Sequence, residues 1–561
     1  MVNVKNLFGM AVMATALVGC SSNDNLAPDG KDNVGKTGEA YASFRINLPT
    51  TTGTRADDPT PGTPSFEHGT AAEYEVKNGT ILIFDATTEK FVTSANLGTM
   101  NPWTDVKTNG VTTSAIATVK LENVKVGGKY KALVLLNNNV DATTEKVKLP
   151  TDAETYAAWS KDASKVDAEK YVSTDGIFMA NAPKYESAKE DPTTLVKINH
   201  VCASPEEAQA KAATVVYVER GLAKVTMKDF TTGGYPIGDG TYAGAKVEIK
   251  NWQLDVTNKS TFPVHQTAGL NSWSEIWNTP RFYDGTNATF KRVYWGVDPN
   301  YDKATYQTLE NCKTAFNMIK KENVVGLAGL ANPQYCLENT FDLNNMKQGQ
   351  TTRVVFKAVF TPKGITTGET FYKIGNNTAI WTEERLKQQI KTVALTAMGI
   401  TNADEQGKYG VDLTKGTNIS GKAGQHLVEA ANITYSGDAA SSKVTGEVVN
   451  TINEKLGLSA EVGISTYLNG EAYYIARIKH FNELTHWNAG EAYGTDNGKY
   501  LGRYGVLRNN WYDLSVTSVS GLGYPDVPEV KPELPDDEND QYINVEVKIL
   551  DWAKRSQSID L

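Results

Sequence analysis

A cysteine near the N-terminus is the residue of this chain best placed for covalent chemistry. Cys20 closes a leader in which Lys5 precedes an apolar stretch from Leu7 to Val18, with a small residue directly before the cysteine. The stretch is too short to cross a bilayer as a helix, so the pattern is typical of a bacterial lipoprotein signal. In this interpretation Cys20 carries a lipid, and acyl chains hold the precursor on a membrane. The alternative is an ordinary secretory signal that contains a cysteine.

A lone arginine is the second residue with a chemical role to predict. Arg55 lies in a stretch rich in Thr, Gly, Asp and Pro, a few residues behind a strand-like segment from Ala40 to Leu48. Irregular polar stretches of this kind are preferred sites of proteolysis. The strand is therefore placed to be cut off. Arg45 also offers an arginine, but it lies inside the strand, and we expect the docked strand to shield it.

A second strand-like segment lies at the other end of the chain. Residues 542–549 alternate apolar and polar side chains, behind a segment from Pro525 to Asp540 that is rich in proline and acidic residues. Because proline removes backbone donors and like charges repel, we expect this tether to stay extended and outside the core. In polyproline geometry it would reach on the order of 50 Å. The alternative is a surface linker before a last strand that folds back into its own domain.

Other reactive side chains give no catalytic or metal-binding pattern. His480 and His486 lack the spacing that places two imidazoles on one helix face, and Cys202, Cys312 and Cys336 form no metal-type pair. We expect these cysteines to be buried or incidental. Motifs for nucleotide binding or serine hydrolysis are also absent from the sequence. The net charge of −9 argues against a nucleic-acid partner. We therefore expect no enzyme activity, no cofactor and no metal.

The elements that position these residues are mainly strands. We predict strands at 79–85, 114–121, 130–137, 176–180, 214–229, 245–256, 352–361, 471–480 and 510–519. Continuous apolar runs such as Ile81 to Phe84 indicate strands that are buried on both faces. Helical insertions are expected at 152–172, 303–321, 382–398 and 444–456. The fold class is therefore mainly β, with two tandem β-sandwich domains and helical insertions.

The domain boundaries follow from these elements. Residues 1–20 form the signal, and residues 21–55 a flexible leader with the removable first strand. An N-terminal sandwich is expected over 56–215 and a C-terminal sandwich over 216–524, with residues near 216–226 carrying the chain between them. Residues 525–561 form the tether and the last strand.

Several segments resemble one protein family. They are Tyr504-Gly505-Val506-Leu507-Arg508-Asn509-Asn510-Trp511-Tyr512-Asp513-Leu514, Gly521-Leu522-Gly523-Tyr524-Pro525 and the closing Asn544-Val545-Glu546-Val547-Lys548-Ile549-Leu550-Asp551-Trp552. Weaker similarity covers residues 134–137, 219–225 and 335–340. Together they resemble the fimbrillins, subunits of the type V pili of Bacteroidales, and most closely the Mfa-like fimbrial subunits.

The resemblance implies transthyretin-like sandwiches and assembly by strand exchange. In that family an arginine-directed protease frees the first strand, and the matching bond here is Arg55-Ala56. The C-terminal strand of another subunit then fills the open groove. The matching apolar faces are Ala42, Phe44, Ile46 and Leu48 in the removed strand, and Ile543, Val545, Val547 and Ile549 in the donor strand.

The resemblance also implies location and partners. The precursor would be lipid-anchored at the outer membrane, and the mature chain would lie in a surface fimbrium that supports adhesion and biofilm formation. Expected partners are other copies of the chain, anchor and tip pilins, a processing protease, and host or bacterial surface receptors. A surface glycan-binding lipoprotein of a nutrient-uptake system is the alternative function. The sequence leaves open the receptor, the protease, the position in the pilus and a disulfide between Cys312 and Cys336.

Overall fold

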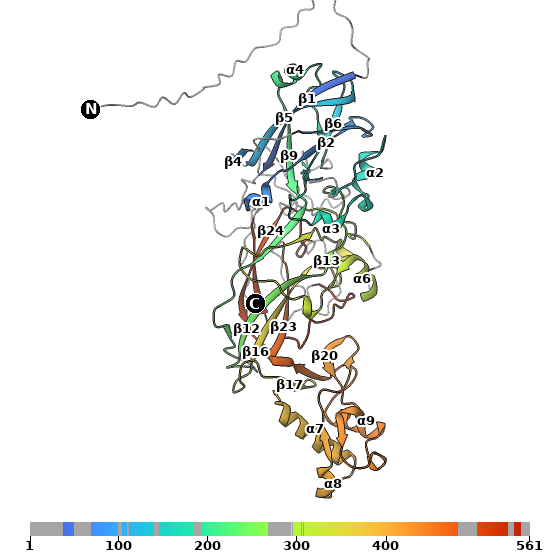
Figure 1. Cartoon of the computed structure of the whole chain (residues 1–561), viewed down its shortest axis with the longest axis vertical. Helices are drawn as coiled ribbons and strands as arrows, with labels where there is room; N and C mark the ends of the chain where they lie inside the picture. The colour runs from blue at the N-terminus through green and yellow to red at the C-terminus, as the bar shows by residue number, and fades with distance from the viewer. Residues whose placement is uncertain are drawn as a thin grey trace, which may run out of the picture.

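Strands dominate the computed structural model, which confirms the mainly β fold predicted from the sequence. It describes residues 38–49, 69–98, 104–108, 111–139, 145–184, 192–267, 293, 295–303, 306, 308–480, 502–536 and 543–550, apart from single positions 294 and 307. Figure 1 shows a first sandwich at the top, a second in the middle and a helical module at the lower end. In the described part of the chain, no helix is long and apolar enough to cross a bilayer.

The first sandwich is one sheet that folds over its own core. Among the described residues its strand order is β3-β2-β6-β7-β9-β1-β5-β4, with β8 beside β6. The strands are β1 (Gly38–Pro49), β2 (Gly79–Asp85), β3 (Phe91–Asn96), β4 (Thr104–Thr108), β5 (Val111–Val124), β6 (Tyr130–Leu136), β7 (Met179–Asn181), β8 (Val196–Lys197) and β9 (Thr214–Arg220). The short helices are α1 (Ala71–Tyr74), α2 (Tyr156–Ser160), α3 (Ala168–Tyr171) and α4 (Pro205–Ala210), with a 3-10 turn η1 (Ala163–Lys165).

Strand β2 contains an unbroken apolar run, Ile81 to Phe84, because both of its faces are buried. Ile81 and Ile83 point into the core that β2 and β6 share with β1, β5 and β9. Leu82 and Phe84 point the other way, into a second cluster that contains Trp159 of α2. Both faces of the strand are therefore buried, as its sequence predicts.

The second sandwich consists of two four-stranded sheets, β15-β10-β24-β25 and β11-β12-β16-β23, over one core. Its strands are β10 (Leu222–Met227), β11 (Tyr235–Pro236), β12 (Lys246–Asp255), β15 (Gln334–Leu337), β16 (Arg353–Thr361), β23 (Glu471–Arg477), β24 (Trp511–Val519) and β25 (Ile543–Leu550). A small pair, β13 (Thr257–Asn258) and β14 (Phe316–Asn317), adjoins α6 (Leu309–Ala315), η3 (Lys321–Asn323) and η4 (Leu343–Asn345).

The chain passes from the first sandwich to the second at Gly221, between β9 and β10. A Cβ atom at this position would lie 2.1 Å from the Tyr171 hydroxyl oxygen. Only glycine leaves room for that contact, because a real side chain would collide with a buried ring. The two sandwiches are therefore joined by a nearly continuous strand.

The helical insertions predicted at 382–398 and 444–456 lie in one module between β16 and β23. It contains β17 (Phe371–Ile374), α7 (Glu383–Ala397), α8 (Ala403–Gly407), β18 (Tyr409–Val411), β19 (Asn418–Ile419), β20 (Lys422–His426), η5 (Ala430–Asn432), β21 (Ile433–Tyr435), η6 (Ala439–Ser441), α9 (Gly446–Lys455), β22 (Ile464–Tyr467) and η7 (Leu468–Gly470). Thr382 caps α7 by accepting a hydrogen bond from Arg385 N, and Leu386, Ile390 and Ala394 bury one face of the helix. These residues belong to a core that is separate from the core of the sandwich.

Candidate functional site

Strand β1 lies inside the first sheet, between antiparallel β5 and parallel β9. Phe44 is opposite Ala117 of β5 and Thr214 of β9. Alternate side chains of β1 have no exposed surface, namely those of Ala40, Ala42, Phe44, Ile46 and Leu48. The four residues predicted to form the removable apolar face thus form a stripe of the first core.

The opposite face of β1 is partly covered by α4. The Ser43 hydroxyl donates to the carbonyl of Ala208 in α4 at 2.9 Å, and Ser114 donates to the Asn47 side chain at 2.6 Å. The Arg45 side chain is exposed, so only its backbone is shielded by pairing with β5 and β9. A central strand held on both edges is costly to remove and leaves a long slot behind it.

Strand β25 occupies the edge of the second sandwich and pairs antiparallel with β24 of its own chain. Val545 is opposite Val516, and Val547 is opposite Leu514. Val545 is half-buried and packs against the core of the sandwich. Whereas β1 has a ladder on each side, the described pairing of β25 is with β24 alone.

The segment Pro525–Asp536, which we call the strap, does not stay outside the core as predicted. Val527 packs with Val355 and Tyr473, and Val530 packs with Cys312 and Phe316. The prolines and acidic residues of the segment predict exposure, but the two valines between them favour burial. Each buried valine contributes roughly 1.5–3 kcal/mol, enough to oppose solvation of the neighbouring charges.

Polar groups of the second sandwich also hold the strap. Arg353 donates from Nε to Asp255 at 2.8 Å and from Nη2 to the Pro528 carbonyl at 2.7 Å. The Thr351 hydroxyl donates to Asp536 at 3.1 Å, and the backbone of Gln348 donates to the Leu534 carbonyl at 3.0 Å. The strap is therefore anchored at both ends to its own domain.

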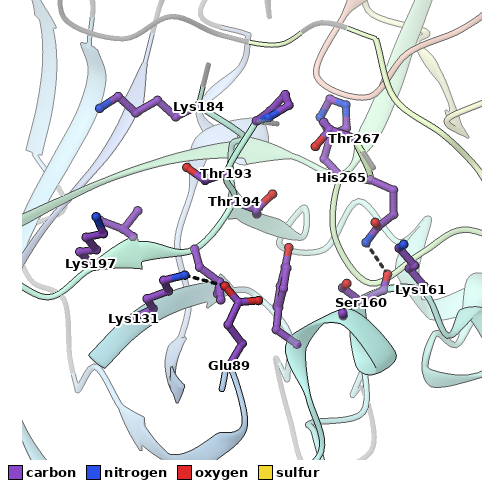
Figure 2. Close-up of a pocket in the computed structure, with 16 residues that line it drawn as sticks. Glu89, Lys131, Ser160, Lys161, Lys184, Thr193, Thr194, Lys197, His265 and Thr267 are labelled. Atoms are coloured by element: carbon purple, nitrogen blue, oxygen red, sulfur yellow. Dashed lines mark hydrogen bonds and ion pairs between the residues drawn. The ribbon is translucent and has the colours of Figure 1, made fainter. Parts of the chain in front are cut away.

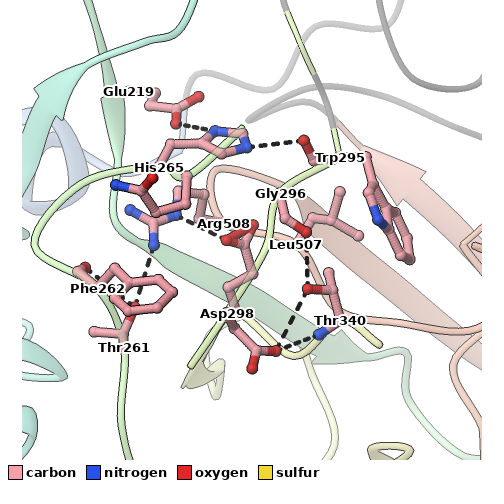
Figure 3. A network of polar contacts seen from close by, with 12 residues as sticks. Glu219, Thr261, Phe262, His265, Trp295, Gly296, Asp298, Thr340, Leu507 and Arg508 are labelled. Carbon is pink, nitrogen blue, oxygen red and sulfur yellow. Dashed lines mark hydrogen bonds and ion pairs between the residues drawn. The ribbon is translucent and has the colours of Figure 1, made fainter. Parts of the chain in front are cut away.

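Three of the segments noted in the sequence meet at the junction of the sandwiches, which Figure 3 shows. In residues 219–225, Glu219 accepts from His265 Nδ1 at 2.7 Å. In residues 335–340, fully buried Glu338 pairs with Arg508 of residues 504–514 at 3.1 Å. Arg508 also donates to the Thr261 hydroxyl at 3.2 Å. The Glu219–His265 contact joins the two sandwiches, whereas the Arg508–Glu338 pair lies within the second sandwich beside it.

The asparagines beside Arg508 secure the crossing at Gly221. Asn509 adopts a positive φ of 56°, donates from its backbone to the Leu222 carbonyl and accepts from Arg220 N. The Asn510 side chain donates to the Arg508 carbonyl at 2.8 Å. Asparagine tolerates the left-handed conformation better than most residues, which explains its place here.

The C-terminal region of the chain matches a known protein family. Residues 465–558 match the family described as major fimbrial subunit protein type IV, fimbrillin, C-terminal, and this range covers β23, β24 and β25. Over this range, the chain is similar to the fimbrillins. The resemblance predicted from the sequence is thus confirmed.

Two solved structures of similar chains come from Parabacteroides distasonis and Porphyromonas gingivalis. A candidate cell-adhesion protein from Parabacteroides distasonis is 10% identical with a TM-score of 0.37, covering 92% of this chain and 99% of its own. The tip fimbrial protein Mfa3 from Porphyromonas gingivalis is 11% identical with a TM-score of 0.24, covering 91% and 100%. No curated protein matches the chain.

A buried ion pair also links the two sandwiches. Glu73 of α1 contacts Lys224 of β10 at 2.7 Å, and the ammonium of Lys224 lies 3.6 Å from the centroid of the Trp511 ring. The Tyr335 hydroxyl donates to the same carboxylate. Burial favours the neutral acid, but hydrogen bonds from Lys224 and Tyr335 outweigh it and lower the pKa of Glu73.

A second buried carboxylate, that of Asp298, has a raised pKa, in contrast to Glu73. Asp298 accepts from the backbone of Thr340 and of Asn300, each at 2.6 Å. Burial nevertheless raises the pKa of Asp298 to about 7, because no cation among the described contacts balances its charge. Apart from its acidic type, nothing in the sequence around Asp298 indicates this behaviour.

The remaining predicted residues fall in two groups. Cys20, Arg55 and Ala56 lie outside the described residues, as does His486. His480 bonds to the Tyr512 hydroxyl at 2.8 Å, and the described residues contain no cluster suited to a metal ion. The other three cysteines, Cys202, Cys312 and Cys336, are buried as expected, and all are free.

Replacing Glu73 with glutamine tests the ion pair at the junction. Glu73→Gln leaves the buried ammonium of Lys224 without a counter-charge, so we expect the free energy of unfolding to fall by about 3–5 kcal/mol. Urea denaturation measures the change. Glu310→Gln is the matched control, because the exposed pair of Glu310 with Lys313 should contribute less than about 1 kcal/mol. Equal losses in the two variants would contradict the assigned role of Glu73.

The pKa of Asp298 predicts a dependence of stability on pH. Between its unfolded value of 3.8 and about 7, the folded chain keeps a proton that the unfolded chain releases. Stability contributed by the protonated group is therefore present below 3.8 and is lost as the pH rises through about 7. Asp298→Asn should lose less stability across this range in denaturation curves, whereas Asp302→Asn, at an exposed neighbour, should behave as the parent chain. A parental slope in Asp298→Asn would contradict the assignment.

Proposed function

We propose that this chain is a structural subunit of a cell-surface fimbria and not an enzyme. In this proposal it is exported as a lipoprotein precursor through Cys20, cut after Arg55, and polymerised by exchange of its C-terminal strand. The observation that carries the proposal is the position of β1, a central strand with a fully buried apolar face that precedes the lone Arg55. The fimbrillin C-terminal match supports the same conclusion.

Cutting the Arg55-Ala56 bond would separate β1 covalently from the rest of the first sandwich. Release of the strand would open a slot between β5 and β9, with unpaired backbone groups on both edges. Its floor would be the core that now contacts Phe44 and Ile46. Such a slot is unfavourable in water and favours addition of a strand.

The C-terminal strand is suited to fill this slot. Ile543, Val545, Val547 and Ile549 repeat with the same period of two as Ala42, Phe44, Ile46 and Leu48. In its own domain, the described ladder of β25 is with β24 alone, whereas the slot offers ladders to β5 and β9. Transfer into another subunit would thus exchange one described ladder for two, which favours assembly.

The docked strap limits how far the strand can reach. If it stays in place, the strap is separated from β25 by residues 537–542, and a segment of that length can span at most about 20 Å. This is shorter than the reach expected for a free tether. Donor and acceptor subunits would therefore have to lie in direct contact, with the strap fixing where the strand leaves its domain.

This function implies partners and a location. The main partners would be other copies of the chain, with anchor and tip pilins at the ends of the filament and a processing protease acting on the precursor. The precursor would be lipid-anchored at the outer membrane, and the filament would contact host or bacterial surfaces in adhesion and biofilm formation.

Replacing Arg55 tests the processing step. Arg55→Ala should keep β1 docked, so that subunits stay on the membrane as monomers and the surface-extracted chain retains its N-terminal segment. Intact mass and electron microscopy of filaments measure both effects. Arg45→Ala is the control, because the exposed Arg45 side chain lies within a strand that is paired on both edges and should not be cut. Normal filaments from Arg55→Ala would contradict the proposed cut, and a mature form that begins at Cys20 would favour a glycan-binding lipoprotein.

Deleting residues 537–561 tests strand donation. Of the described side chains of β25, Val545 is the one that packs on the sandwich core, so the truncated chain should still fold. It should accept a strand from another subunit but donate none, and so shorten filaments when mixed with the parent chain. Normal polymers of the truncated chain alone, seen by electron microscopy, would rule out C-terminal donation.

A further inference from the structure

A basic pocket lies between the two sandwiches, away from β1 and β25. It has a volume of about 440 Å³, within the range of small-molecule sites. Its walls come from α2, from β6 and β8 with the residues before β8, and from residues 265–267 of the second sandwich. Figure 2 shows the polar side chains that line it.

The charge of the pocket is opposite to that of the chain. Among the described lining residues, four are lysines, Lys131, Lys161, Lys184 and Lys197, and one is a carboxylate, Glu89. Glu89 pairs with Lys131 at 2.6 Å, and the other three lysines are exposed. The whole chain has a net charge of −9, so this is a local concentration of positive charge that attracts an anion.

The rest of the lining offers hydroxyl and amide groups that are firmly held. Ser160, Thr194 and Gln266 are buried, and Gln266 donates to the Ser160 carbonyl at 2.7 Å. Neighbouring His265 is fixed by its bond to Glu219. These groups come from both sandwiches, so the contacts that join the two sandwiches also hold the lining of the pocket in place.

An apolar surface completes the pocket. Tyr156, Leu195 and Val196 line it, and the Tyr156 ring is half-buried and held edge-on against Phe84 at 5.7 Å between centroids. Burial raises the pKa of Tyr156 to about 12, so its hydroxyl remains a hydrogen-bond donor at neutral pH. A ligand must therefore combine negative charge, several hydroxyl groups and an apolar face.

We propose that this pocket binds a carboxylated sugar, a uronic-acid unit of a surface polysaccharide. A lysine ammonium would pair with the carboxylate, the hydroxyl and amide groups would bind the sugar hydroxyls, and the C–H face of the ring would lie against Tyr156 and Leu195. A phosphate fits less well, because no arginine is present among the described lining residues to bind it in bidentate fashion. The site involves neither the slot nor the donor strand and would add direct glycan contact to the subunit.

Binding of glucuronic acid to the full-length chain tests this proposal. Isothermal titration should detect glucuronic acid, with affinity that falls as salt is added. The double variant Lys161→Glu with Lys197→Glu should bind at least ten times more weakly, because it reverses two charges of the pocket. Lys129→Glu reverses an exposed charge outside the lining and should bind as the parent chain does. All three lysines are exposed, so thermal unfolding should show that the variants fold normally.

Two comparison ligands decide the chemical class. Glucose, which lacks the carboxylate, should bind at least ten times more weakly than glucuronic acid, and inorganic phosphate should not displace glucuronic acid at equal concentration. Equal binding of glucose would overturn the role of the lysines. Displacement by phosphate would overturn the choice of a sugar, and unchanged affinity in the double variant would overturn the site.

Discussion

The crossing from β9 to β10 is the constraint on which the rest of the structure depends. At Gly221 the chain leaves the first sheet and enters the second within one residue, and the contact with Tyr171 leaves no room for a side chain. Charged residues around the crossing are buried and must be neutralised, which Lys224 with Glu73 and Arg508 with Glu338 achieve. The two sandwiches therefore hold a defined relation to each other.

The same crossing lies between β1, the strand proposed to be removed, and β25, the strand proposed to be donated. Strand β9 pairs in parallel with β1, and β10 pairs in parallel with β24, which in turn holds β25. Backbone ladders on each side, joined by the chain at Gly221, thus connect the proposed acceptor slot to the proposed donor strand. The difference between the ends is energetic: β1 has a ladder on both edges and a fully buried apolar face, while the described ladder of β25 is with β24 alone. This asymmetry is what would make exchange favourable.

The junction also creates surface that neither sandwich has alone. Residues 265–267 follow β13 of the second sandwich and close a pocket whose lysines belong to the first. Because His265 and Glu219 are buried together, the pocket is supported by the contacts that hold the domains. The helical module lies at the far end of the molecule in Figure 1 and has its own core.

The sequence by itself determined the local structure of this protein. Apolar runs such as Ile81 to Phe84 specified strands buried on both faces, and the cap and spacing of residues 382–398 specified a helix, because both signals depend on neighbouring residues. Only the tertiary structure decided that β1 is central, since pairing partners lie far apart in the chain. The same holds for the strap, whose composition predicted exposure, while the pockets that receive Val527 and Val530 come from distant elements. Burial depends on what lies opposite a side chain, which a single segment cannot specify.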